Sequence, residues 1–328
     1  MIMRQRTFLI TFMVVMLLPV LWAPAAFADQ ADDLFQKGTE YLREGNLVKA
    51  IQAFTDVLAI NSKHADAYNN RGLAYYEQGQ YAPAEADFAN AIKYDPTDEK
   101  ANNNLALVYY VQGQYDQAEI YYNKALSFSA EEKPYYADVY NNLGVIYAKK
   151  DKFQDALTAY NNAIRVTETK NLGYTDAYYN RGNLYYNQGK FDAAIVDYTK
   201  TIDFYEGSVD RTSYAADAHY NRGLCYYNKK LYDQALADYD SAIAIRPDFK
   251  WAHYSKGYTL FMQGRYDQAL ASFQQAISID PNFDYAHFGL GLVYQRKGDQ
   301  KNCISSLQTS CDLGNTSACN ALKELGAR

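Results

Sequence analysis

A small residue, Gly or Ala, recurs along this chain at intervals of 34, 34, 38, 38, 41, 34 and 34 residues. These residues are Gly38, Gly72, Ala106, Gly144, Gly182, Gly223, Gly257 and Gly291. We number each as position 8 of a repeat, so that eight repeats begin near residues 31, 65, 99, 137, 175, 216, 250 and 284. A period of this length indicates a solenoid, in which each repeat packs only on its neighbours.

Other positions of the repeat also keep their residue type. Position 11 is Tyr in every repeat except at Leu260, position 20 is Ala except at Cys303, and position 24 is aromatic except at Leu307. Positions 8 and 20, 4 and 24, and 11 and 17 each add up to 28, which is expected of facing residues in an antiparallel helix pair. Small residues at 8 and 20 would let the two backbones approach, with aromatic rings on either side.

This pattern resembles the tetratricopeptide repeat family, in which position 4 is aromatic, 8 is Gly, 11 is Tyr, 20 is Ala, 24 is aromatic and 32 is Pro. The resemblance covers about residues 31–317, with Pro96, Pro247 and Pro281 at position 32. It implies an all-α fold, a right-handed superhelix of αα-hairpins with helix A of each repeat on the concave side. Repeats 3 to 5 lack this Pro and carry inserts, which we expect to lengthen helix B or to loosen the following turn.

The C-terminal segment differs from the repeat. Cys311 and Cys319 lie eight residues apart and precede a short amphipathic stretch, so that a cap is expected over about residues 315–326. The segment resembles the cysteine-rich αα-solenoid repeats of secreted proteins, and this resemblance implies a disulfide between Cys311 and Cys319. We interpret Cys225 and Cys303 as buried small residues that form no bridge.

Residues 1–28 have the layout of a secretory signal peptide. Arg4 and Arg6 carry the only charges, an apolar run follows, and Ala26-Phe27-Ala28 resembles a cleavage site before Asp29. The alternative is an uncleaved membrane anchor, and contact with a membrane is expected only in that case. No Cys follows the apolar run to carry a lipid anchor. We therefore expect residues 29–328 to form a single exported solenoid, periplasmic or secreted.

Charge limits the kind of partner. Loss of residues 1–28 removes two positive charges and moves the formal net charge from −6 to −8, which disfavours binding to nucleic acid. Position 6 never carries Lys or Arg, so a clamp for acidic peptide tails is also disfavoured. Position 2 carries a row of aspartates, at Asp66, Asp138, Asp176 and Asp217. The partner is therefore expected to be another protein or an extended peptide, neutral to basic.

Positions 7 and 23 vary together. Arg occupies position 7 only in repeats whose position 23 is Asp, namely in the pairs Arg71 with Asp87, Arg181 with Asp197, and Arg222 with Asp238. We predict three structural salt bridges between helices A and B. As exposed pairs, each would contribute about 0 to 1 kcal/mol.

Position 6 is Asn in five consecutive repeats: Asn70, Asn104, Asn142, Asn180 and Asn221. A side-chain amide can both donate and accept hydrogen bonds, as a peptide backbone does. The row resembles the concave Asn row of the tetratricopeptide superhelix of O-linked N-acetylglucosamine transferase, which implies that these amides bind the main chain of an extended peptide. The alternative is that they hydrogen-bond to neighbouring helices.

The chain has 34 tyrosines, more than a core requires. Helical geometry places positions 12 and 5 beside the groove. Their aromatic residues are Tyr76, Tyr110, Tyr186, Tyr227 and Phe261 at position 12, and Tyr179, Tyr220, Tyr254 and Phe288 at position 5. Tyrosines supply much of the binding energy at protein interfaces, which favours peptide binding. Because tyrosine also stacks on sugar rings, a module that binds cell-wall carbohydrate is the alternative.

No constellation of catalytic residues or cofactor motif stands out from the repeat, so we expect neither an enzyme nor a cofactor. His219, His253 and His287 occupy position 4 of successive repeats. Equivalent sites on successive repeats are separated by a helix pair, whereas the ligands of one zinc ion lie about 2.1 Å from it. We therefore interpret the three histidines as packing residues, and we expect no metal site.

Overall fold

The computed structural model describes residues 29–128, 133–173, 175–206 and 213–326. Within these residues every regular element is a helix. None of the helices in the described ranges combines the length and the apolar character needed to span a bilayer. The predicted signal peptide, residues 1–28, lies outside the described residues.

Each predicted repeat is a hairpin of two helices, A and B. In order, the pairs are residues 29–43 with α2 (Leu47–Ile60), α3 (Ala65–Glu77) with α4 (Tyr81–Tyr94), α5 (Glu99–Val111) with α6 (Tyr115–Ser127), α7 (Tyr136–Lys149) with α8 (Phe153–Thr169), α9 (Asp176–Asn187) with α10 (Phe191–Glu206), α11 (Ser213–Asn228) with α12 (Tyr232–Ile245), α13 (Lys250–Met262) with α14 (Tyr266–Ile279), and α15 (Asp284–Lys297) with α16 (Gln300–Asp312). The all-α fold of αα-hairpins predicted from the repeat is confirmed.

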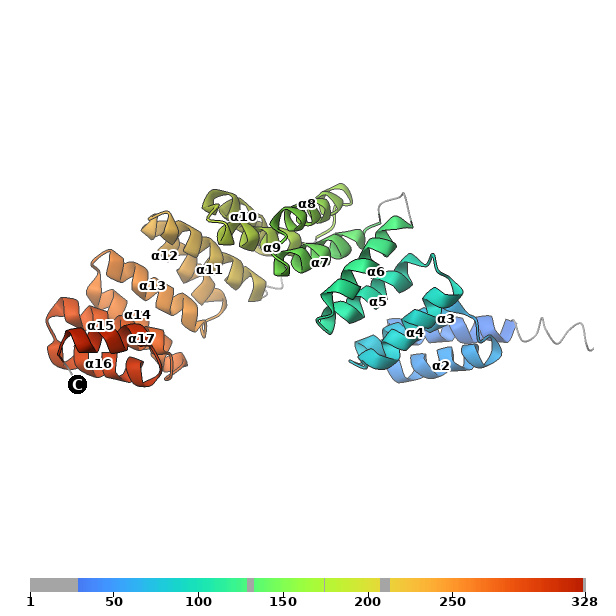
Figure 1. Ribbon diagram of the computed structural model, residues 1–328, viewed down its shortest axis with the longest axis horizontal. Helices are drawn as coiled ribbons and strands as arrows, with labels where there is room; N and C mark the ends of the chain where they lie inside the picture. Colours follow the sequence, from blue (N-terminus) through green and yellow to red (C-terminus); the bar gives the residue numbers. More distant parts are fainter. Residues whose placement is uncertain (1–28, 129–132, 174, 207–212, 327–328) are drawn as a thin grey trace, which may run out of the picture. The chain divides into compact units, whose positions relative to one another are not determined.

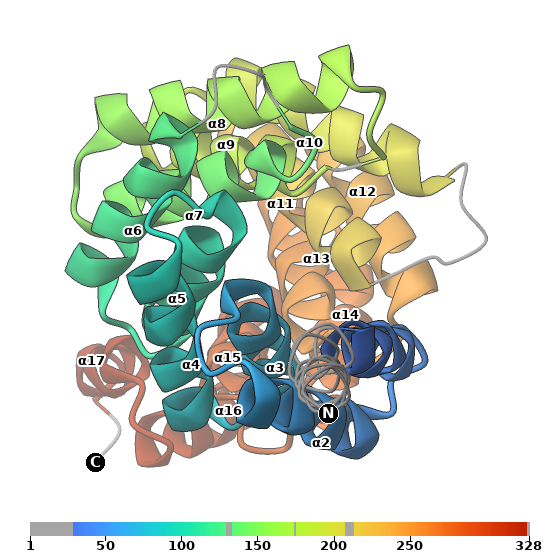
Figure 2. The same cartoon turned by 90° about the vertical axis from the view of Figure 1, so that its right-hand side faces the viewer.

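The described residues divide into two compact units between Val139 and Tyr140, with the boundary inside α7. Figures 1 and 2 show helices α2 to α6 of the first unit in blue to teal, lying in consecutive pairs. In the first unit α3 contacts α5; in the second, α9 contacts α11, α11 contacts α13 and α13 contacts α15. Successive A helices therefore form one continuous face within each unit. That the two units form a single solenoid stays a prediction.

The close approach inside each hairpin differs in detail from the expected facing pairs. A methyl group added at Gly38 would lie 2.7 Å from the ring of Phe54, and one at Gly223 would lie 2.7 Å from the ring of Tyr239. Position 8 thus lies against the ring at position 24, whereas position 20 offers only its backbone, with the carbonyl oxygen of Ala235 3.3 Å from the added group. The large ring occupies the space that the missing side chain leaves.

The turn between helices A and B uses a left-handed residue at position 15. In six repeats this residue is Gly, with φ between 69° and 77°: Gly45, Gly79, Gly113, Gly189, Gly264 and Gly298. Asp151 and Lys230 adopt the same conformation in the other two, with φ of 56° and 62°. The amide of this residue and the next amide then bond back to helix A; in repeat 2, Gly79 N donates to the Tyr76 oxygen at 2.8 Å and Gln80 N to the Tyr75 oxygen at 2.9 Å.

The inserts act in the two expected ways. Helices α8 and α10 have 17 and 16 residues, whereas α12 and α14 have 14 each. The insert of repeat 4 therefore goes mostly into helix B, whereas the seven-residue insert of repeat 5 adds only two residues to it. Helix α6 has only 13 residues, and the insert of repeat 3 therefore falls in the connection that follows it.

The C-terminal helix α17 (Thr316–Glu324) covers the last hairpin. Its Ala318 and Leu322 pack with Cys303 and Leu307 of α16. Asn315 accepts a hydrogen bond from Ala318 N, which caps the helix. The structure joins Cys311 and Cys319 in a disulfide with Cα atoms 4.8 Å apart, and the thiols of Cys225 and Cys303 are free and buried.

Candidate functional site: the face of the A helices

The structure forms the three Arg–Asp pairs, and it places them in the interior. In each, Nε and Nη2 of the arginine both donate to the carboxylate, at 2.7 and 2.8 Å in the pair of Arg71 with Asp87. The Asp197 side chain is only 2% exposed and that of its partner Arg181 18%. The expectation of exposed pairs is therefore wrong, because helix packing excludes water from both partners.

Each of these arginines also contacts the preceding repeat. The third guanidinium nitrogen, Nη1, donates to a polar residue at position 25 of that repeat: Arg71 to Thr55 at 3.0 Å, Arg181 to Asn161 at 2.5 Å and Arg222 to Thr199 at 2.9 Å. Sequence reasoning missed position 25, although a polar residue there precedes every Arg at position 7. All three nitrogens of each guanidinium thus bond within the protein, which disfavours these arginines as ligand-binding groups.

The asparagines at position 6 hydrogen-bond between successive A helices. Asn104 donates to Asn69 at 2.9 Å, and Asn180 donates to Asn141 at 2.9 Å. Asn221 donates to the Tyr179 hydroxyl at 3.0 Å and to Asn183 at 3.2 Å. The amide of Asn70 accepts a long contact from Asn69 at 3.5 Å, and Asn142 also has a partner. All five lie half-buried on the A-helix face, where any peptide must use the amide groups that remain.

The aromatic residue at position 12 packs on the ring at position 17. From the sequence, we expect the residue at position 11 to face position 17 instead. Ring centroids are separated by 5.6 Å for Tyr76 with Tyr81, 5.9 Å for Tyr110 with Tyr115, 5.7 Å for Tyr186 with Phe191, 5.7 Å for Tyr227 with Tyr232 and 5.7 Å for Phe261 with Tyr266. The position 12 rings remain half-buried, so part of each is available at the surface.

The aromatic residues at position 5 cover the buried ring at position 24 of their own repeat. Tyr179 lies 5.9 Å from Tyr198, Tyr220 lies 5.9 Å from Tyr239, and Tyr254 lies 5.8 Å from Phe273. Phe288 instead packs against the buried cluster beneath the C-terminal cap. The position 5 residues thus combine core packing with a partly exposed edge.

In the second unit these tyrosines surround a pocket of about 250 Å³. It is lined by Tyr186, Leu224, Tyr227, Asn228, Tyr239, Tyr254, Ser255 and Tyr258. Helices α9, α11 and α13, the A helices of repeats 5 to 7, supply all of these residues except Tyr239, which lies on α12. Burial raises the pKa of Tyr227 to about 12, so that the phenol is neutral at physiological pH.

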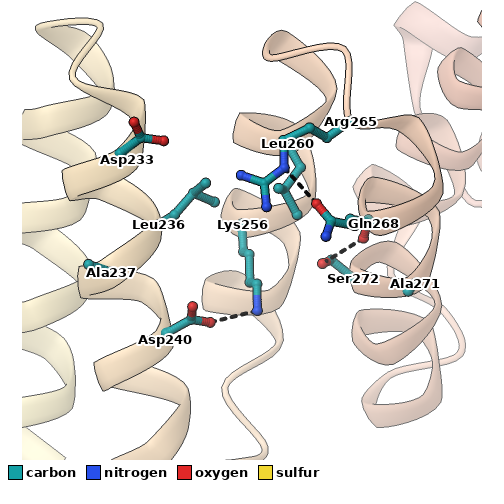
Figure 3. Close-up of a pocket in the computed structure, with 10 residues that line it drawn as sticks. All are labelled: Asp233, Leu236, Ala237, Asp240, Lys256, Leu260, Arg265, Gln268, Ala271 and Ser272. Carbon is teal, nitrogen blue, oxygen red and sulfur yellow. Dashed lines mark hydrogen bonds and ion pairs between the residues drawn. The ribbon is translucent and has the colours of Figure 1, made fainter.

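A second pocket, of about 520 Å³, lies among α12, α13 and α14 (Figure 3). Repeat 7 has Lys256 and Ser272 at positions 7 and 23, where other repeats have the Arg–Asp pair. Lys256 instead donates to Asp240, at position 25 of the preceding repeat, over 2.6 Å. The shorter hydroxyl and the redirected lysine leave the space that this pocket occupies, and it reflects a change in packing within the scaffold.

The three histidines at position 4 serve the scaffold. Nε2 of His253 donates to the Pro247 carbonyl, and Nε2 of His287 donates to the Pro281 carbonyl, each at a distance of 3.0 Å. The ring nitrogen must be the donor, because a carbonyl oxygen can only accept. His219 Nδ1 lies 3.0 Å from Asp238. In the described part of the chain, His, Cys, Asp and Glu side chains form no group that could hold a metal ion.

Two of the position 2 aspartates have different surroundings. Asp217 accepts from Arg246 at 2.5 Å, so its charge is already neutralised within the protein. Burial raises the pKa of the Asp176 carboxyl, with no compensating cation among the causes. Asp66 and Asp138 are exposed.

Stacked helical hairpins with a continuous face of A helices within each unit define a helical repeat scaffold. Sequence models described as Tetratricopeptide repeat match residues 65–98, 98–169, 175–207, 216–249 and 239–271, and one described as TPR repeat matches residues 38–79 and 257–298. Together they cover most of the chain, which belongs to the tetratricopeptide repeat family. A comparison with curated proteins finds no match.

Solved structures share the fold. A chain in the crystal structure of the APC/C hetero-tetramer Cut9–Hcn1 is 16% identical, with a TM-score of 0.56 over 79% of this chain and 47% of that one. This chain thus spans about half the length of that relative. A tetratricopeptide repeat protein from Parabacteroides merdae is 19% identical, with a TM-score of 0.53 over 80% of this chain and 98% of that one. At this identity the likeness concerns the fold alone.

Proposed function

We propose that this protein is an exported scaffold that holds an extended segment of a partner protein along its A-helix face. The observation that carries the proposal is the pocket of about 250 Å³, to which the A helices of three successive repeats all contribute tyrosines. Half-buried tyrosines that are not needed to fill a core are typical of protein interfaces.

The asparagine row supports the same function. Each position 6 amide has two donor hydrogens and a carbonyl oxygen. Asn104 and Asn180 each donate one hydrogen to the preceding repeat, and the Asn104 oxygen also accepts from Asn103 at 3.3 Å. The remaining groups match the alternating donors and acceptors of a peptide main chain. The internal bonds hold the amides in place, so less side-chain entropy is lost when a ligand binds.

The direct test is photocrosslinking with a photoreactive residue at position 186 or 227. We expect both positions to capture a polypeptide from the extract in which the protein works, with the captured segment identified by mass spectrometry. The matched control is position 274 on α14, an exposed helix B site away from the pocket. Equal capture at all three sites contradicts the proposal, and capture of a glycan alone would favour carbohydrate binding.

Export is the second part of the proposal, and it is supported by the charge and hydrophobicity pattern of residues 1–28. Sequencing the amino terminus of the protein recovered from its native compartment tests it. A mature chain that begins at Asp29 is expected. An intact Met1 on protein that cofractionates with membranes would support the anchor instead.

A further inference from the structure

Tyr239 and Tyr198 occupy position 24 in adjacent repeats, but their hydroxyl groups have different environments. Tyr198 donates to Asn183, at position 9 of its own repeat, over 2.7 Å. In repeat 6 position 9 is Leu224, which cannot accept a hydrogen bond. The Tyr239 side chain is 0% exposed, and its hydroxyl forms no hydrogen bond of normal geometry.

The neighbouring polar groups do not supply the missing bond. The Thr259 hydroxyl is close enough to oppose the rise in the pKa of Tyr239 that burial causes, but the two hydroxyls form no hydrogen bond of normal geometry. The Thr259 hydrogen is donated to the Ser255 carbonyl at 2.8 Å, so it is not available to the Tyr239 oxygen. A buried hydroxyl without a partner is unfavourable, so it is expected to be rare unless it has a function. Both Tyr239 and Leu224 line the tyrosine pocket.

The walls of the pocket are suited to a flat cation. Tyr186, Tyr227, Tyr254 and Tyr258 contribute rings, and no charged side chain is among the lining residues. Elsewhere on the protein similar rings already carry a guanidinium group, as Arg71 lies 5.6 Å from the Tyr68 ring and Arg296 5.8 Å from the Phe261 ring. Within the described residues, no Lys or Arg lies over the four pocket rings.

We propose that this pocket receives one arginine side chain of the bound peptide, with the guanidinium against the tyrosine rings and one of its N–H groups donating to the Tyr239 hydroxyl oxygen. This inference rests on the proposed peptide-binding function and names the anchor residue. The volume of about 250 Å³ lies below the range of about 300 to 1,000 Å³ usual for drug-sized ligands, which is consistent with a single side chain.

Arginine fits better than the alternatives. Its guanidinium is planar, stacks on aromatic faces and is more weakly hydrated than the ammonium of lysine, so it loses less on entering an uncharged pocket. A carboxylate would face the negative faces of the rings without a cation to pair with. A phenylalanine would fill the space but leave the Tyr239 hydroxyl without a partner.

The test uses the full chain and a series of blocked Gly/Ser peptides that differ only in a central Arg, citrulline, Phe or Glu, with binding measured by NMR titration. We expect the Arg peptide to bind at least fivefold more tightly than the citrulline peptide, which has the same shape without the charge. Equal binding of Arg and citrulline, or preference for Phe or Glu, overturns the proposal.

Two single-atom variants separate the role of the hydroxyl from the fold. Tyr239→Phe should weaken binding of the Arg peptide about three- to tenfold and leave the melting temperature unchanged or raised, because the folded protein loses no hydrogen bond. Tyr198→Phe should lower the melting temperature and leave the affinity unchanged. Unchanged affinity in Tyr239→Phe contradicts the role of this hydroxyl, because Phe at position 24 is accepted by the fold, as at Phe88 and Phe273.

Leu224→Asn offers an independent check. It copies Asn183 into repeat 6, and the new amide should accept from the Tyr239 hydroxyl and occupy part of the pocket. We expect a higher melting temperature together with loss of Arg-peptide binding; binding that is kept or strengthened counts against the proposal. If photocrosslinking at position 227 still captures a polypeptide while the Arg series shows no preference, the anchor is wrong and the proposed function stands.

Discussion

Asp197 and its equivalents show how a single residue position couples two helices and two repeats. The carboxylate accepts two bonds from Arg181, whose third nitrogen reaches Asn161 in the preceding repeat. Positions 7 and 23 could be paired from the sequence, because their co-variation is repeated three times in one chain. Their burial could not, since it depends on how the next hairpin covers them.

Asp197→Ser should lower the free energy of unfolding by about 3 kcal/mol, because it leaves a guanidinium that is 18% exposed without its carboxylate. The double variant Arg181→Lys with Asp197→Ser copies the pair found in repeat 7 and should recover part of that loss. Chemical denaturation of both variants measures the difference. An Asp197→Ser variant as stable as the unsubstituted protein would show that the pair contributes nothing.

Burial also makes the protein sensitive to alkaline pH. It raises the pKa of the Cys225 thiol from 9.0 to about 12 and that of the Tyr227 phenol from 10.0 to about 12. In the unfolded chain both groups lose their protons near their ordinary pKa values, so the unfolded state binds fewer protons than the folded state over this range. The contribution of these two groups to the free energy of unfolding should therefore be constant below their ordinary pKa values and fall as the pH rises from about 9 to 12.

Urea denaturation at pH 8 and at pH 10.5 measures this loss of stability. Cys225→Ala copies the buried Ala74 at the same position and should reduce the part of the loss that begins near pH 9. Stability that is independent of pH up to 11 in the unsubstituted protein would contradict the assigned burial of these groups.

At the scale of the hairpin, the turn requires a residue with a left-handed backbone conformation at position 15, and two repeats have a residue other than glycine there. Lys230 has φ of 62°, a conformation that costs a residue with a side chain about 1 to 2 kcal/mol. Gly occupies the site in six repeats, so the signal was present in the sequence. We did not predict this turn residue from the sequence, because we considered only the residues that face each other between the two helices.

Lys230→Gly should therefore raise the free energy of unfolding by about 1 kcal/mol. The matched change in the opposite direction is Gly189→Lys, where a side chain would meet nothing within 4 Å and only the backbone conformation matters. We expect this variant to lose a similar amount in thermal or chemical denaturation. Two effects of the same sign would refute the explanation.

The cap is the other element with its own prediction. Cys311 and Cys319 close a loop at the end of α16, and the disulfide would add about 2.5 kcal/mol by restricting the unfolded chain. Thiol titration of the denatured, unreduced protein should find two free thiols, those of Cys225 and Cys303. Four reactive thiols would show that the bridge does not form in the isolated protein.

On the scale of the whole molecule, hydrogen bonds between successive A helices link stability to binding. Asn104, Asn180 and Asn221 each donate to a residue of the preceding repeat. Replacing all three by Ala should remove about 1 kcal/mol of stability for each hydrogen bond and should also weaken partner binding. Asn302→Ala, on an exposed face of α16, is the control.

Unchanged binding in the triple variant would leave the asparagines with a purely structural role. Denaturation and a binding assay on the same sample separate the two effects. The aromatic pocket would remain as the site of recognition in that case, because none of its lining residues is an asparagine at position 6.

The sequence alone determined the repeat, the fold of αα-hairpins and the three Arg–Asp pairs, because these depend on contacts within one hairpin that recur at a fixed spacing. It also gave the asparagine and tyrosine rows of the A helices, since residues at equivalent positions share a face. These properties follow from helical periodicity.

Only the tertiary structure decided what those rows contact. The bond from Asn104 to Asn69, the contact of Arg222 with Thr199 and the hydroxyl of Tyr239 left without a partner all depend on the rotation and translation between one hairpin and the next. That relation is set by the packing of many side chains at once, and within it Leu224 in place of an asparagine leaves the Tyr239 hydroxyl without the partner that Tyr198 has in the neighbouring repeat.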